Sequence, residues 1–149
     1  ELDYRPAMSI ERLRVGTPAI VQLSVLDAAL DAWNHVDMAE LRVASVALSD
    51  CFIREVAARC PMLKLASPHD SAQRGSQVSF AFEHGYAAMQ ALIDRGVIGD
   101  FRAPAIMRFG FAPLYLDEGD VVRAAEIIEE VMSDELWRDP MYQAVSRVT

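Results

Sequence analysis

One arginine lies inside an apolar run with the pattern of a β-strand, and a cation in that position can bind an anion. The run is APAIMRFGFAPLYL, residues 103–116, and Arg108 lies near its middle. Because side chains alternate along a strand, burial of Met107 and Phe109 on one face would place Arg108 and Gly110 on the other. The glycine would leave room beside the guanidinium. The pattern therefore predicts an anion-binding position at Arg108.

The same pattern also has a simpler structural explanation. An ion pair of Arg108 with Asp94 or Asp100, or a merely outward-facing arginine, is favoured over an anion site by alternation alone. A second candidate is Thr17 in the segment VGTP, where a hydroxyl and the free amides of a helix start can bind a phosphate or a carboxylate. There too, capping of the helix is the simpler explanation.

The other reactive residue types predict no further site. His35, His69 and His84 lack the i, i+4 spacing of a helical metal pair, and the glycines form no nucleotide-binding pattern. Cys51 and Cys60 fall in one helical pattern without a CxxC motif, so we predict two buried thiols and no disulfide. Helix capping and a solvated helix face explain the acidic segments DEGD and EIIEEVMSDE. We expect no metal and no catalytic residue in this chain.

The composition is that of one soluble domain with a substantial core. The chain has 149 residues, 52% of them apolar, and its 14 basic and 22 acidic residues give a net charge of −8. This balance argues against a nucleic acid or an anionic membrane surface as the main partner, and no apolar run reaches the ~20 residues needed to cross a bilayer. We expect a reduced, cytoplasmic protein. Because the sequence begins at Glu1 without an initiator methionine, we also expect a fragment.

The elements that must position Arg108 and Thr17 follow from periodicity. Capping signals and apolar spacing predict four helices, at residues 18–33, 37–59, 85–95 and from about 117 onward. Period-2 alternation predicts three strands, at residues 62–67, at 77–82 and around Met107. The first helix, with Thr17 as its cap, is apolar on most sides and is expected to be central. Grouped strands and helices without βαβ alternation imply an α+β fold, with a small, mainly antiparallel sheet of about three strands covered by helices.

Several segments together resemble the C-terminal part of the kynureninase family, within the class V aminotransferase group of pyridoxal-phosphate enzymes. These segments are RVGTPAIVQLSVLDAALD, RGSQVSF, HGYAAMQALIDRGVIGDFRAPAIMRFGFAPLY and the helix that follows. The resemblance covers essentially the whole chain, and the block from ALIDRGVIGDFR to IMRFGFAPLY is its most specific part. It implies the α+β small domain found at the C-terminus of aspartate-aminotransferase-type enzymes.

The resemblance also implies a reaction. Kynureninases hydrolyse L-kynurenine or 3-hydroxykynurenine to anthranilate or 3-hydroxyanthranilate and L-alanine, with pyridoxal 5'-phosphate as the electron sink. Arg108 matches the arginine of the family's R-F-G-F motif and would hold the substrate α-carboxylate in a bidentate pair. Thr17 would face the active site of the partner subunit of a homodimer, near the cofactor phosphate or the substrate.

The sequence departs from the family because the cofactor-bearing large domain and its Schiff-base lysine are absent. Lys64 is the one lysine present, and an exposed strand edge explains it better than a cofactor site. We therefore expect residues 1–149 to be one small domain, with residues 1–16 leading in from the missing large domain, that is inactive alone and does not bind the cofactor stably. Two alternatives remain open: another class V enzyme such as a cysteine desulfurase, and a free-standing binding or dimerisation domain without chemistry.

Overall fold

The computed structural model describes residues 5–14 and 16–144, and the chain divides into two compact units. The first unit, Glu1–Val36, contains the 3-10 turn η1 (Ser9–Leu13), helix α1 (Ile20–Leu30) and the turn η2 (Asp31–Trp33). The expected capping of this helix by Thr17 is wrong. Ala19 precedes the first helical residue with an extended backbone, so the helix begins too far along the chain for the Thr17 hydroxyl to reach its free amides.

Helix α1 is apolar around its whole circumference, yet none of its residues is buried. Its large apolar side chains are all at least 51% exposed; they are Ile20, Val21, Leu23, Val25, Leu26 and Leu30. The structure describes this helix only within the first unit, so the expectation that it is the central element stays a prediction. Within the first unit no described residue covers this apolar surface, and such a surface is typical of a helix that meets another polypeptide.

We expect the isolated chain to self-associate through this exposed helix, because burying its apolar side chains removes them from water. Sedimentation velocity over a range of concentrations measures the effect, with the double variant Leu23→Lys/Leu26→Lys as control. The variant should shift the distribution toward monomer. A monodisperse monomer of the unsubstituted chain at high micromolar concentration would contradict this prediction.

The second unit, Asp37–Thr149, begins with a capped helix. Helix α2 (Met38–Arg59) starts after Asp37, whose carboxylate accepts hydrogen bonds from the amides of Ala39 (2.7 Å) and Glu40 (3.1 Å), which confirms the predicted start. The other elements of this unit are α3 (Gly85–Asp94), α4 (Glu118–Ser133), α5 (Pro140–Gln143) and the turns η3 (Ser71–Gln73) and η4 (Leu136–Arg138). None of the helices described is long and apolar enough to span a membrane.

The sheet of this unit has four strands, where about three were expected. They are β1 (Lys64–Leu65), β2 (Gln77–Ala81), β3 (Asp100–Arg102) and β4 (Ile106–Gly110). Their order is β1-β2-β4-β3, and each neighbouring pair is antiparallel, as predicted for an α+β fold. The additional strand is β3, which escaped prediction because its three residues include two charged ones. This short strand forms because its backbone pairs with β4.

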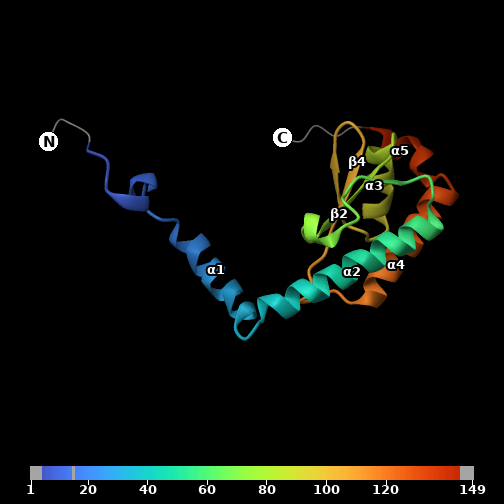
Figure 1. Cartoon of the computed structure of the whole chain (residues 1–149). Helices are drawn as coiled ribbons and strands as arrows, with labels where there is room; N and C mark the ends of the chain where they lie inside the picture. Colours follow the sequence, from blue (N-terminus) through green and yellow to red (C-terminus); the bar gives the residue numbers. More distant parts are fainter. Residues whose placement is uncertain (1–4, 15, 145–149) are drawn as a thin grey trace. The chain divides into compact units, whose positions relative to one another are not determined.

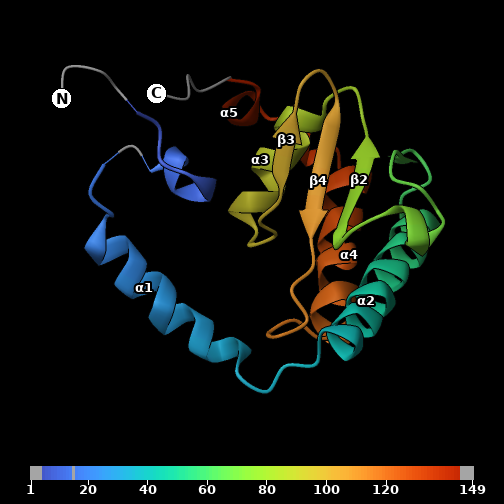
Figure 2. The same ribbon diagram turned by 60° about the vertical axis from the view of Figure 1, so that its left-hand side comes forward.

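Helices α2, α3 and α4 cover one face of this sheet (Figures 1 and 2). Met107 and Phe109 of β4 point into that core, where the Phe52 ring of α2 lies 5.1 Å from the Phe109 ring and 5.2 Å from the Phe111 ring. These contacts fix which way β4 faces. Arg108 and Gly110 consequently lie on the opposite face, as the alternation predicted.

Candidate functional site

The face of the sheet opposite the helices, called the open face below, carries Arg108 between two polar neighbours. In the strand register Arg108 stands opposite Ser79 of β2 on one side and Asp100 of β3 on the other. Residues that share a cross-strand row point the same way, so all three side chains lie on the open face. Gly110 follows on β4, and no heavy atom lies within 4 Å of the position that a Cβ would take there. The open face therefore has room beside Arg108.

Arg108 forms an ion pair with Asp100, one of the two carboxylates that the sequence offered as its partners. Nη2 of Arg108 donates to Oδ2 of Asp100, and Nε of Arg102 lies 3.5 Å from the same oxygen. Asp94, the other candidate, instead accepts a hydrogen bond from the Tyr142 hydroxyl at 2.9 Å. The Arg108 side chain remains 27% exposed. The structure thus shows the ion pair and leaves part of the guanidinium accessible.

The pair changes the titration of Asp100. The hydrogen bond from Arg108 is the main cause that lowers the pKa of Asp100 below its ordinary value, and the charge of Arg102 adds to it. A lowered pKa means that the carboxylate is charged throughout the neutral range. The ion pair is then complete above the ordinary pKa of Asp100 and is lost only as the pH falls through the lowered value.

The Asp100 contact uses one of the five N–H donors of Arg108. Nε is buried and has no hydrogen-bond partner among the described residues. Both hydrogens of Nη1 and the second hydrogen of Nη2 also have no partner in the described part of the chain. A carboxylate that binds a guanidinium in bidentate fashion needs two parallel donors. Nη1 and the second hydrogen of Nη2 remain available for this, whereas Nε is buried.

A second arginine, Arg74, donates several hydrogen bonds inside the fold, and the sequence pattern did not predict a role for it. Its side chain is only 2% exposed and donates to the backbone oxygens of Pro68 (3.1 Å) and His69 (2.6 Å), to Oγ of Ser49 (3.3 Å) and to Asp50. These bonds tie the loop before β2 to helix α2. Arg74 therefore anchors the loop that leads into β2, a role that no local sequence signal could reveal.

Thr17, the second predicted site residue, belongs to the first unit and precedes helix α1. The structure describes the two units separately, so its proposed role stays a prediction. Lys64 lies exposed on β1, the edge strand of the sheet, as expected. Among the described residues, no group of three His, Cys, Asp or Glu side chains could hold a metal ion.

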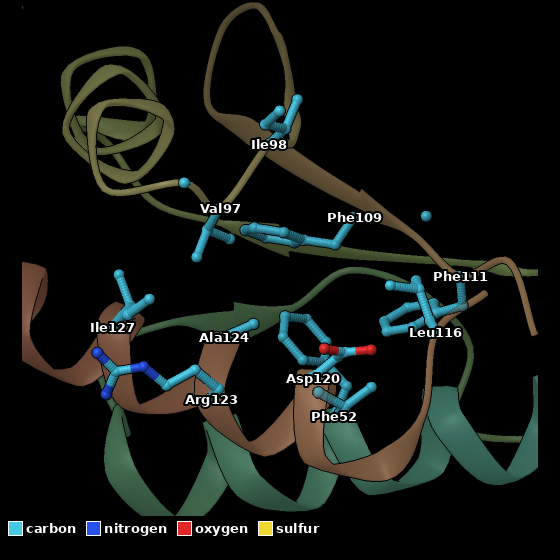
Figure 3. A pocket seen from close by; sticks show the side chains of 13 residues that line it. Phe52, Val97, Ile98, Phe109, Phe111, Leu116, Asp120, Arg123, Ala124 and Ile127 are labelled. Carbon is cyan, nitrogen blue, oxygen red and sulfur yellow. The ribbon is translucent and has the colours of Figure 1, made fainter.

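A cavity of about 300 Å³ lies on the helix side of the sheet (Figure 3); Gly110 is among the residues that line it, and Arg108 is not. Phe52, Phe109 and Ala124 are among the apolar side chains that line it. Its charged lining residues are already engaged, because Asp120 completes the capping box of α4 and Arg123 pairs with Glu126. Its lining offers no unpaired charged group for chemistry.

Cys51 and Cys60 are both buried and unpaired, as predicted. Burial raises the pKa of the Cys60 thiol to about 11 and also raises the pKa of the Cys51 thiol. A raised pKa leaves less thiolate at neutral pH, and the thiolate is the nucleophile. Neither residue has the environment that a reactive cysteine of a desulfurase requires.

We expect neither cysteine to react with a thiol reagent in the folded chain at pH 7, because both are buried and protonated. Titration with 5,5'-dithiobis(2-nitrobenzoate) measures this, and the unfolded chain in denaturant is the control, in which both thiols should react within minutes. Rapid modification of either cysteine in the folded chain would contradict the prediction. It would instead support the alternative that the chain belongs to a cysteine desulfurase.

The comparisons with known proteins agree on one protein family. Residues 41–128 match the model of the kynureninase C-terminal domain. The chain is 45% identical over 151 residues to a kynureninase of Pseudomonas fluorescens, in an alignment covering 100% of this chain and 36% of that protein. Kynureninases of Burkholderia mallei strain SAVP1 and Burkholderia pseudomallei strain K96243 are likewise 45% identical over 148 residues, covering 98% of this chain and 36% of each relative.

The chain thus spans about a third of the length of these relatives. The family match includes most of α2, all of α3, the whole sheet and most of α4, and so contains Arg108 together with Asp100. It covers more than half of the chain. The chain accordingly belongs to the kynureninase C-terminal domain family.

Proposed function

We propose that this chain is the C-terminal part of a hydrolase that cleaves L-kynurenine, or 3-hydroxykynurenine, to anthranilate, or 3-hydroxyanthranilate, and L-alanine. In this reaction water is consumed and the bond between Cβ and the carbonyl carbon Cγ of the substrate is broken. The observation that carries the proposal is Arg108, held by Asp100 at one nitrogen on the open face while two parallel donors remain unpaired. The proposal takes its substrate class from the kynureninase relatives.

Arg108 would bind the α-carboxylate of the substrate. A planar guanidinium with two free donors matches a carboxylate in geometry as well as charge, and Gly110 leaves space for the ligand beside it. The strand register places Lys64, Arg102 and Arg108 on the open face together with Asp100. The strand residues of this face thus carry a net positive charge, although the chain carries a net charge of −8. That local charge attracts an anionic group.

We propose that the complete enzyme, meaning this chain joined to its large domain, uses pyridoxal 5'-phosphate, which supplies an electron sink when bound. The described residues of this chain do not fit that cofactor. Lys64 is exposed on a two-residue edge strand, and no enclosed site surrounds its amine. The cofactor's lysine would therefore come from the large domain, and stable binding to this chain alone is not expected.

We further propose a cytoplasmic homodimer in which Thr17 faces the active site of the partner subunit. The exposed apolar surface of α1, which follows Thr17 closely in the sequence, supports an interface in this region.

Product analysis tests the proposed function. The complete enzyme, supplied with its cofactor, should convert L-kynurenine to anthranilate and L-alanine in equal amounts, followed by anthranilate fluorescence and amino-acid analysis. It should release no sulfur from L-cysteine, and the 149-residue chain alone should be inactive. Alanine formed from cysteine without cleavage of kynurenine would support the desulfurase alternative, whereas no turnover of either substrate would support a binding domain.

A further inference from the structure

Asp100 is held in place opposite Arg108 by the backbone. It begins β3 and pairs with Arg108 in the antiparallel register, and Arg108 pairs with Ser79 of β2 on the other side. Gly99, which precedes Asp100, allows this approach. A Cβ at Gly99 would lie 2.6 Å from Cε of Met89 and 2.8 Å from the backbone oxygen of Arg108, too close for any other residue without a shift of the strand. The sheet therefore fixes the backbone of Asp100 directly beside Arg108.

The contact with Asp100 orients the Arg108 guanidinium and leaves its other donors free for a ligand. Asp100 accepts from Nη2 alone, and its Oδ2 is also 3.5 Å from Nε of Arg102. Because the carboxylate is shared between two guanidiniums, it does not neutralise Arg108 completely. Both hydrogens of Nη1 and one of Nη2 remain without a partner in the described chain, so the outer edge of the guanidinium can still accept a bidentate ligand.

We infer that Asp100 is a positioning residue for substrate binding, holding the guanidinium of Arg108 by Nη2 so that its free edge is presented to the substrate α-carboxylate. This inference rests on the proposed function of Arg108. A long arginine side chain that is free to rotate must be ordered when the substrate binds, and that ordering weakens binding. Asp100 orders it beforehand. The opposite role, in which Asp100 competes with the substrate for Arg108, predicts tighter binding when Asp100 is removed.

The experiment uses the complete enzyme with Asp100→Ala and Asp100→Asn. It measures kcat and KM for L-kynurenine and the inhibition constant of kynuramine, which is kynurenine without its carboxylate. In Asp100→Ala we expect KM to rise about tenfold through loss of preorganisation, with kcat changed less than about threefold. The inhibition constant of kynuramine should stay within about twofold, because kynuramine has nothing for Arg108 to bind.

Asp100→Asn distinguishes positioning from a general structural role. The amide oxygen can still accept from Nη2 of Arg108, so KM should rise less than in Asp100→Ala. Asp134→Asn is the matched control, since it makes the same change at an exposed carboxylate at the end of α4 and should leave both constants unaltered. If Asp100→Ala does not fold, a rise in KM for Asp100→Asn without a change for kynuramine decides in favour of the inference.

An unchanged or lower KM in the Asp100 variants would overturn the inference, as would an equal loss of affinity for kynuramine. Arg108→Ala, measured in parallel, separates this failure from that of the proposed function. If Arg108→Ala weakens binding of kynurenine but not of kynuramine while the Asp100 variants do neither, Arg108 keeps its role and Asp100 has none. If Arg108→Ala shows no carboxylate-specific effect, the proposed function of Arg108 itself fails.

Discussion

Replacing Arg108 with alanine in the complete enzyme is expected to lower kcat/KM for L-kynurenine by roughly 30- to 1000-fold, equivalent to about 2–4 kcal/mol. The substrate carboxylate would lose its charge-assisted partner and with it the orientation of its Cα–H bond. The fold should persist, because Arg108 lies on the open face and its one side-chain bond goes to a partly exposed carboxylate. Steady-state kinetics together with a thermal melt of the same preparation measure both effects.

Arg108→Lys should recover only part of the lost activity, since an ammonium keeps the charge but cannot offer two parallel donors. The matched control is Arg123→Ala, which removes an arginine that is 70% exposed on α4 and should leave kcat/KM unchanged. A sharply lower melting temperature for Arg108→Ala, with turnover per folded molecule intact, would instead mean that the ion pair with Asp100 is purely structural.

Replacing Arg74 with alanine is expected to reduce the free energy of unfolding of the chain by about 2–4 kcal/mol. The change removes a guanidinium side chain that is only 2% exposed, together with its bonds to the backbone oxygens of Pro68 and His69 and to Oγ of Ser49. Asp50 is half exposed and solvated, so its lost ion pair contributes the smaller part. Urea unfolding followed by far-ultraviolet circular dichroism, at one fixed protein concentration, measures the effect.

Arg123→Ala is again the control, since an exposed i, i+3 pair with Glu126 should contribute no more than about 0.5 kcal/mol. Arg74→Lys should be intermediate, because a lysine can reach some but not all of the acceptors. Should Arg74→Ala unfold at the same urea concentration as Arg123→Ala, the loop before β2 would not depend on Arg74.

Local signals in the sequence were sufficient for the parts of the fold that depend on near neighbours. Asp37 caps α2 because a carboxylate at that position reaches the amides of the next turn, whatever the rest of the chain does. Gly96 follows α3 with a φ of +87°, a backbone conformation that glycine adopts without strain. The two faces of β4 followed from alternation alone, and with them the side of the sheet on which Arg108 lies.

Long-range features could not be predicted in this way. The sequence offered Asp94 and Asp100 equally as partners of Arg108, and the pairing of β3 with β4 decided between them. The bonds of Arg74 join residues that are 24 and 25 positions apart, and no periodicity carries that information. Helix α1 was expected to be central because its residues are apolar, but composition does not say which surface covers such a helix, and within the first unit none of its residues is buried.

Strand β4 separates the requirements of folding from those of the ligand recognition proposed for Arg108. Met107 and Phe109 are locked into the core, so the backbone that carries Arg108 cannot shift without disturbing the packing beneath it. Gly110, in contrast, faces open space, where added side-chain atoms meet no neighbour among the described residues. Under the proposed function, a new substrate preference is therefore most accessible through substitutions at open-face positions such as Gly110, which can reshape the surroundings of Arg108 while the evolving protein keeps its stability.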